Sequence, residues 1–153
     1  MLHLIGQRLA LMHDVARWKW NHDRPIHDPA REALLLDGLV ERGAKHDLEP
    51  ELVRAFFTAQ MEASKQIQEA DFRQWKAEQR ERFDSVPDLS TELRPRIDQL
   101  SESLLTSLAS LAPSRGSREL RPVLERLAPE FIARDAIDPE VFQQAIAPLT
   151  GAD

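Results

Sequence analysis

The sequence predicts an all-α protein: a helical bundle with one long central helix and several shorter helices. Three observations support this fold class. Helix-favouring residues dominate the 153-residue chain, with Leu, Ala, Glu, Gln and Arg prominent. Tyrosine is absent, and no segment alternates clearly between apolar and polar residues as a half-buried strand would. One breaker-free segment of roughly 30 residues far exceeds the average helix of ~11–12 residues and is typical of the spine of a bundle.

The first helix is expected from about Leu2 to Asn21, with Leu11 and Val15 on its apolar stripe. It should end before Pro25, because a residue that precedes proline avoids the helical backbone. A second helix is expected from Asp28 to about Arg42. Aspartate is a good N-cap and proline fits the first helical position.

Gly43 suits the C-terminal end of this second helix. The long helix is expected from Glu49-Pro50 to the breakers at 85–87. A fourth helix should begin with Ser90 or Thr91 as its cap and reach about Ala112. The remainder predicts two or three short helices separated by prolines, at positions 122, 129, 139 and 148.

Composition excludes several classes of function. The formal net charge is −6, whereas a general nucleic-acid binder needs a basic face. The chain has no cysteine, so it offers no disulfide, thiol nucleophile or thiolate metal site. No apolar run approaches the ~20 residues that span a bilayer. The N-terminus lacks the order of a signal peptide, which predicts either a cytoplasmic protein or a mature form that starts on an added Met1.

Two cations lie on a mostly apolar face of the first helix. Arg8 and Lys19 are eleven residues apart, so they project within about 20° of each other. One interpretation is that their heads reach solvent while their stems pack. The other is that they are buried, which requires partners because buried Lys and Arg are rare otherwise.

Neutral polar residues recur on the long helix as Gln60, Ser64 and Gln68, with spacing i, i+4, i+8. They form either an exposed polar side or a buried stripe that must find hydrogen-bond partners. In the first turn of the second helix, Asp28 is explained as a cap and Glu32 by the helix dipole. Arg31 is not stabilised by the helix dipole there, because a cation is unfavourable at the N-terminal end of a helix. It therefore needs a negative partner, inside or outside the chain.

Other motifs are absent. The five histidines show no HExxH or HxxEH spacing, so a metal site is not favoured. The chain also lacks a GxSxG, Walker or GxGxxG pattern.

The polar positions together resemble a chorismate mutase of the all-helical AroQ class, more narrowly the exported, monofunctional gamma subclass. The resemblance rests on R-x10-K, then D-x2-R-E, then S-x3-Q, over about residues 5 to 75, with Arg94 in "LRPRIDQL" as the main match beyond. It implies a single all-helical domain over residues 1–153. Residues 1–85 would supply the main active-site helices and residues 86–153 the C-terminal helices that contribute Arg94. The implied location is periplasmic or secreted.

The resemblance also implies the reaction and the roles of the residues. Chorismate would rearrange to prephenate in a pericyclic step that needs no cofactor and no metal. Arg8 and Arg94 would clamp the substrate carboxylates, and Arg31 would add a further cation. Lys19 and Gln68 would donate to the ether oxygen. Asp28 and Glu32 would lie near the ring hydroxyl, and Ser64 would back the pocket.

Gln68 departs from many gamma members, which resemble this chain but carry a glutamate there. The resemblance further implies a homodimer in which each site lies within one protomer, with no nucleic acid or membrane as partner. Two alternatives stay open. One is an isochorismate-pyruvate lyase on the same fold, against which the short link from Asn21 to Asp28 argues. The other is a non-catalytic helical binding protein, whose charged positions would lie exposed rather than line a pocket.

Overall fold

The computed structural model describes residues 1–115 and 117–150, and over these residues the regular structure is entirely helical. The predicted all-α fold class is confirmed. The α-helices are α1 (Leu2–Asn21), α2 (Pro29–Ala44), α3 (Pro50–Ala77), α4 (Arg94–Leu111), α5 (Leu120–Asp135) and α6 (Pro139–Ile146). A π-helical turn, Leu89–Leu93, leads into α4, and 3-10 turns at Ala112–Ser114 and Ala147–Thr150 follow α4 and α6.

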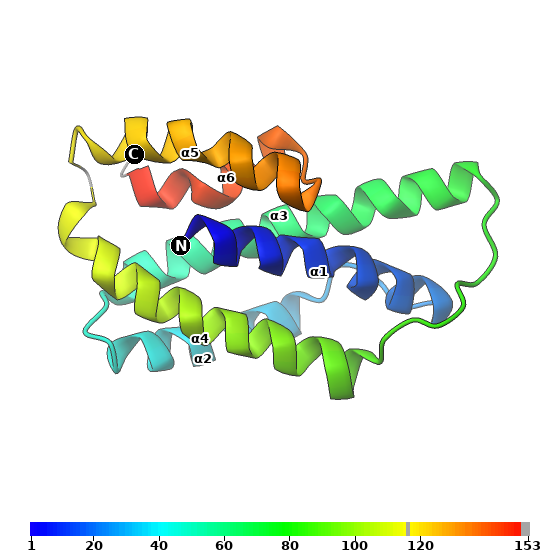
Figure 1. Ribbon diagram of the computed structural model, residues 1–153. Helices are drawn as coiled ribbons and strands as arrows, with labels where there is room; N and C mark the ends of the chain where they lie inside the picture. Colours follow the sequence, from blue (N-terminus) through cyan, green and yellow to red (C-terminus); the bar gives the residue numbers. More distant parts are fainter. Residues whose placement is uncertain (116, 151–153) are drawn as a thin grey trace.

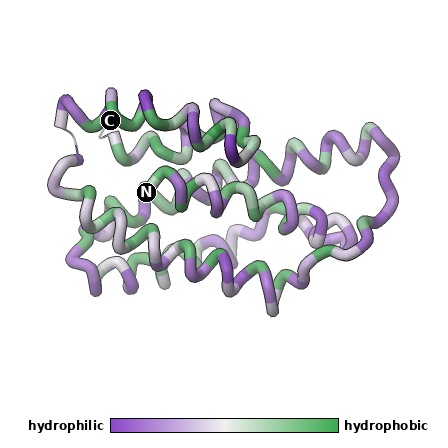
Figure 2. Tube along the Cα trace, viewed as in Figure 1, coloured by the Kyte–Doolittle hydropathy of each residue, from purple (hydrophilic) through white to green (hydrophobic). Residues whose placement is uncertain are grey.

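The helices form a bundle around α1 and the 28-residue α3, which lie side by side (Figure 1). In Figure 1, α2 and α4 lie below this pair and α5 and α6 lie above it. Green apolar and purple polar segments alternate along the helices (Figure 2), as expected where each helix buries one stripe. Most of the largest fully buried side chains come from α1, α3, α4 and α6, and they include Ile5, Phe56, Phe57, Leu105 and Phe142.

The corner between α1 and α2 is closed by hydrogen bonds. α1 ends where expected, and Asp23 follows with a φ of 48°, a left-handed conformation that stops the helix. Lys19 reaches across the corner and donates from Nζ to the carbonyl oxygen of Ile26 at 2.9 Å. Asp28 caps α2 by accepting from the backbone N–H of Arg31 at 3.1 Å. The predicted cap at Asp28 is therefore confirmed.

Gly43 does not end α2, which corrects the sequence-based interpretation. The helix continues to Ala44, and Lys45 follows with ordinary right-handed angles. A Cβ atom at Gly43 would lie 2.6 Å from Cγ2 of Val53. The glycine is therefore needed for close packing of α2 on α3 and not for a left-handed cap.

The connection between α3 and α4, residues 78–88, also differs from expectation. α3 ends at Ala77, because the chain reverses through Gln79, whose φ is 51°, and the N–H of Arg80 bonds back to the Trp75 carbonyl at 2.9 Å. The cap of the next helix is Asp88 rather than Ser90 or Thr91. Its carboxylate accepts from the N–H groups of both of those residues at 2.9 Å.

α5 and α6 form two C-terminal helices, within the predicted number of two or three, but Pro122 and Pro129 lie inside the 16-residue α5 and do not separate helices. Asp138 caps α6. Both helices pack on α1 and α3 on the side away from α2 and α4 (Figure 1). Among the described residues, no helix combines the length and the apolar character that a membrane span requires.

Candidate active site

A cavity of about 240 Å³ lies between α1, α2, α3 and the start of α4. All eight residues singled out in the sequence line it: Arg8, Lys19, Asp28, Arg31, Glu32, Ser64, Gln68 and Arg94. Apolar side chains complete the wall: Met12, Val15, Trp18, Pro25, Ile26, Leu35, Met61, Leu89 and Ile97. Residues from four helices, far apart in the sequence, therefore face one small volume.

Arg8 is a buried cation at the wall of this cavity. Its side chain is 7% exposed, so the interpretation that its head reaches solvent is wrong. Nη1 donates to Ser64 Oγ at 2.9 Å and to the Gln60 carbonyl oxygen at 3.3 Å, while the buried Nε has no hydrogen-bond partner among the described residues. Burial lowers the pKa of Arg8 to about 10, and the charge of Asp98 opposes this. The guanidinium is still charged at neutral pH.

Lys19 is half-buried, and its ammonium group lies among charges of both signs. Burial lowers the pKa of Lys19, the carboxylates of Glu32 and Asp28 oppose this, and Arg31 and Arg94 add to the lowering. The hydrogen bond to the Ile26 carbonyl uses one of its three N–H groups. The other two remain available to a ligand.

The polar stripe of α3 is buried. Gln60 is 0% exposed, Ser64 6% and Gln68 4%. Gln68 donates from Nε2 to the Ser64 carbonyl oxygen at 3.0 Å, and Met12 Sδ lies 3.9 Å from the same nitrogen. Gln60 lies behind the cavity wall and donates from Nε2 to the Ala145 carbonyl oxygen of α6 at 2.8 Å. The stripe therefore connects the cavity with the C-terminal helices.

Glu32 is held by a lysine that the sequence analysis overlooked. Lys65 donates from Nζ to Glu32 at 3.0 Å and to Glu62 at 2.6 Å, and its side chain is only 13% exposed. Glu32 also accepts from the Asp28 N–H at 3.2 Å. Burial alone would raise the pKa of Glu32, but the hydrogen bonds from Lys65 and Asp28 and the charge of Lys65 outweigh burial and lower the pKa.

Arg31 and Arg94 both face the cavity without a carboxylate at ion-pair distance in the described part of the chain. Arg94 makes a 3.3 Å hydrogen bond from Nη1 to Ser90 Oγ. Its pKa is lowered by burial first and by the charge of Arg31 next, whereas Asp88 and Asp98 oppose this. Two unpaired guanidinium groups at one cavity favour an anionic ligand.

Three charged residues of the cavity were missed from the sequence: Arg24, Lys65 and Asp98. Lys65 had a usable signal, because it follows Ser64 and lies one helical turn from Met61 on the stripe beside the polar one. Arg24 and Asp98 carried none, because each is one of many charged residues near a helix end.

The cavity is cationic in an acidic protein. Six of its side chains are basic and three are acidic, a formal excess of three positive charges, while the whole chain carries −6. Such local charge attracts an anion whatever the net charge. The fold and the cavity define a class of protein: an all-helical bundle with a cationic cavity between its helices that suits a small anion.

Comparisons with known proteins narrow this class. The family model "Chorismate mutase type II" matches residues 1–69. The "Secreted chorismate mutase" of Mycolicibacterium smegmatis is 30% identical over 141 residues, which cover 92% of this chain and 77% of that protein. The "Monofunctional chorismate mutase" of Enterobacter agglomerans is 36% identical over 105 residues, which cover 69% of this chain and 57% of that protein.

The solved structures agree. The crystal structure of chorismate mutase from Burkholderia thailandensis is 36% identical, with a TM-score of 0.89, and covers 97% of this chain and 95% of that one. The chain belongs to the chorismate mutase family, in its all-helical AroQ class, and is an isomerase.

Proposed function

We propose that this cavity rearranges chorismate to prephenate by holding the folded substrate and stabilising the charge that develops on its ether oxygen. The step is pericyclic: the bond from the ether oxygen to the ring breaks while a carbon–carbon bond forms, within one molecule. No bond to the protein is made. The protein's contribution is therefore orientation and electrostatics.

Arg8 and Arg94 clamp the two carboxylates of the substrate in this proposal. Arg8 has donors to spare, because its two hydrogen bonds both leave from Nη1. Arg94 enters from the start of α4. A planar guanidinium can bind a carboxylate with two parallel hydrogen bonds, which fixes orientation as well as position. Arg31 adds a third cation to the carboxylate region.

Lys19 and Gln68 act on the ether oxygen. Lys19 keeps two N–H groups beyond its bond to Ile26, and Gln68 keeps one beyond its bond to the Ser64 carbonyl. The second Gln68 N–H has only the Met12 sulfur nearby, a weak acceptor that a substrate oxygen would replace. Both residues thus donate where negative charge grows in the transition state.

The remaining three residues orient the ring and the clamp. Glu32 accepts a hydrogen bond from the ring hydroxyl, and Asp28 lies beside it at the helix start. Ser64 supports Arg8 from behind, at 2.9 Å. Its own hydroxyl donates to the Gln60 carbonyl at 2.6 Å, so its lone pairs are directed to Arg8.

The burial of Arg8 without a carboxylate carries the proposal. A charge removed from water costs several kcal/mol unless it is paired. The described residues offer Arg8 only neutral acceptors. A substrate carboxylate supplies the missing partner, and this accounts for an arginine at a position where the fold alone would favour an apolar residue.

The test is an assay of purified protein with chorismate, in which loss of chorismate and gain of prephenate are both measured. Arg8→Ala and Arg94→Ala should each lower kcat/KM by roughly 30- to 1000-fold, because each loses a charge-assisted bond worth about 2–4 kcal/mol. Lys19→Ala should lower kcat more than it raises KM, because its bond strengthens mainly in the transition state. Near-wild-type kinetics for both arginine variants would refute the proposal.

The same assay separates the alternatives. A lyase would convert isochorismate to pyruvate in preference to rearranging chorismate. A non-catalytic binding protein would turn over neither compound. Among the charged positions of the cavity, Arg8 is buried and Lys19, Glu32 and Arg94 are half-buried, whereas Asp28 and Arg31 line the cavity from exposed positions. The burial of the first four supports the enzyme.

The proposal extends to the whole protein. The chain acts as a homodimer of the gamma subclass, in which residues 1–153 form one domain and each site uses residues of one chain. Export to the periplasm or the medium is part of the same proposal. It is supported by three relatives that are named secreted chorismate mutases, from Mycolicibacterium smegmatis, Mycobacterium tuberculosis and Yersinia pestis.

A further inference from the structure

The connection between α3 and α4 is fastened to the end of α1. Residues 78–88, called the strap below, contain no helix and run across the end of the bundle (Figure 1). Asn21, the last residue of α1, pairs with the backbone of Phe83 in both directions. Its Nδ2 donates to the Phe83 carbonyl at 2.9 Å, and its Oδ1 accepts from the Phe83 N–H at 2.8 Å. An amide side chain thus takes the place of a neighbouring strand.

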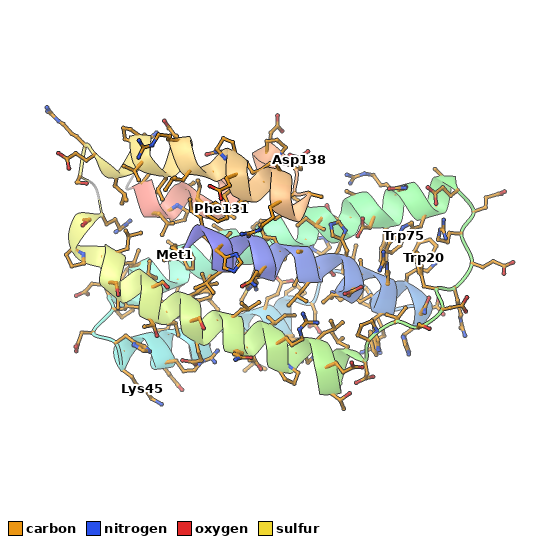
Figure 3. The ribbon with its side chains drawn as sticks, viewed as in Figure 1. Met1, Trp20, Lys45, Trp75, Phe131 and Asp138 are labelled. Carbon is orange, nitrogen blue, oxygen red and sulfur yellow. The ribbon has the colours of Figure 1, made fainter. Side chains whose placement is uncertain are left out.

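The neighbouring tryptophan adds a second attachment. Trp20 Nε1 donates to the carbonyl oxygen of Glu81 at 3.0 Å. Its ring meets the Trp75 ring edge to face, with centroids 5.6 Å apart, and Figure 3 shows both residues where α1 and α3 end. Phe83 packs on Trp75 as well, at 4.6 Å between centroids. The strap is therefore held by three hydrogen bonds to α1 and by an aromatic cluster.

The strap leads directly into the residue that completes the cavity. Five residues beyond Phe83, Asp88 caps the π-helical turn, and Arg94 is the first residue of α4. The amide of Thr91 lowers the pKa of Asp88 most. The end of α1 therefore contacts the strap through Trp20 and Asn21.

Arg94 depends on this arrangement because little else holds its side chain. Its one hydrogen bond within the described chain goes to Ser90, which belongs to the same turn. The position of its guanidinium is thus set by where α4 begins. If the strap were fixed only at its two ends, the start of α4 could fray. The attachment at Phe83 shortens the unattached segment before α4.

We propose that Asn21 is a positioning residue for catalysis: by pairing with Phe83 it fixes the strap and so places Arg94 at the cavity from within the same chain. The inference rests on the proposed role of Arg94. Asn21 does not line the cavity. It acts on the reaction only through Arg94, and this distinguishes it from a residue that merely stabilises the fold.

A double-mutant cycle tests this inference. Asn21→Ala should lower kcat/KM for chorismate about tenfold, mostly through KM, because displacement of a clamping group by about 1 Å can cost up to 100-fold. In the Arg94→Ala background the same substitution should change kcat/KM less than about twofold, since the residue it positions is gone. An equal loss in both backgrounds would overturn the inference.

Two further variants guard against misfolding. Trp20→Phe removes only the N–H to Glu81 and keeps a ring in the cluster, so it should show the same coupling to Arg94 at a smaller size. Gln66→Ala is the matched control, since it removes a hydrogen bond between α3 and α6, from Gln66 Nε2 to Gln144 Oε1 at 2.6 Å, away from the cavity. It should lower Tm without changing KM. If Arg94→Ala itself has no effect, the proposed role of Arg94 fails instead, whereas loss of activity in Arg8→Ala would still support the proposed function.

Discussion

The amide of Gln68 has two N–H groups, and only one of them is bound to a strong acceptor. An amide donates at any ordinary pH, whereas a carboxyl group donates only while protonated. Gln68→Glu should therefore be most active at acidic pH and lose activity as the new carboxyl ionises. Burial raises the pKa of this carboxyl and nearby cations lower it.

The measurement is the ratio of variant to wild-type kcat across pH, which removes the effect of substrate protonation. This ratio should fall as pH rises. A ratio that stays flat or climbs would mean that Gln68 does not donate to the ether oxygen.

Lys65 is expected to keep Glu32 ionised. Its hydrogen bond and charge lower the pKa of Glu32 against the effect of burial, so Lys65→Gln should raise that pKa relative to the wild type. Glu32 then takes up a proton at a higher pH. The acidic limb of kcat/KM should move to higher pH in the variant, provided that ionised Glu32 is the form that binds substrate.

Glu62→Gln is the matched control. It removes the other partner of Lys65, at 2.6 Å, but it does not line the cavity. The acidic limb of kcat/KM in Glu62→Gln should stay in place.

The same linkage applies to stability. The lowered pKa of Glu32 stabilises the fold above the pKa of this carboxyl in the unfolded chain, and this contribution is lost as pH falls through its pKa in the folded protein. An unshifted acidic limb in Lys65→Gln would argue against the role.

The eight cavity residues could be named from the sequence because their order and spacing, with Arg94 as a separate match, resemble those of a known family, and such a resemblance can be recognised before the helices are placed. Their partners could not be named. That Arg8 bonds Ser64, or that Glu32 bonds Lys65, depends on how α1 and α2 pack on α3. The functional roles of all of them stay predictions.

At the scale of the helix, the two glycines of α2 offer a comparison. A Cβ at Gly38 meets nothing within 4 Å, whereas one at Gly43 lies 2.6 Å from the Val53 side chain. Gly38→Ala should stabilise the protein by about 0.5–1 kcal/mol, the gain of alanine over glycine within a helix. Gly43→Ala should destabilise it by about 1–3 kcal/mol, because Val53 is fully buried and β-branched and cannot move aside easily.

Chemical denaturation of both variants checks this pair of effects. The denaturant slope should stay unchanged, so that the midpoint alone reports stability. Stabilisation by Gly43→Ala would show that α2 can move away from α3 at little cost.

The ends of the helices were predictable where neighbouring residues in the sequence determine them. Asp28-Pro29 gave the start of α2 and Pro25 the stop of α1, because capping and proline sterics act within a few residues. The cap of the turn before α4 was predicted wrongly although its chemistry is local: the Asp88 carboxylate accepts from the N–H groups of Ser90 and Thr91, so the cap lies before both of those residues. The end of α3 was predicted wrongly because tertiary contacts set it. The reversal at Gln79 brings Phe83 onto Trp75, a contact that no local pattern announces.

At the scale of the whole molecule, the chain itself supplies Arg94 to the cavity that holds Arg8. If the protein is a homodimer with each site within one chain, mixing Arg8→Ala and Arg94→Ala protomers should restore no activity. A site shared between chains would regain one intact copy in every mixed dimer. The measurement is activity after the two variants are unfolded, mixed and refolded together, with each variant refolded alone as the control.

The hydrogen bond between Gln60 and the Ala145 carbonyl limits how far this enzyme can be miniaturised. A chain ended at Leu111 would lose that carbonyl together with the buried faces of Phe142 and Ile146. The Gln60 amide would then lose its acceptor and lie at a newly exposed apolar surface. The carbonyl of the same residue accepts from Arg8, so the change would reach the cavity wall. A working shortened catalyst would therefore need a redesigned outer face on α1 and α3 before any change to the cavity is made.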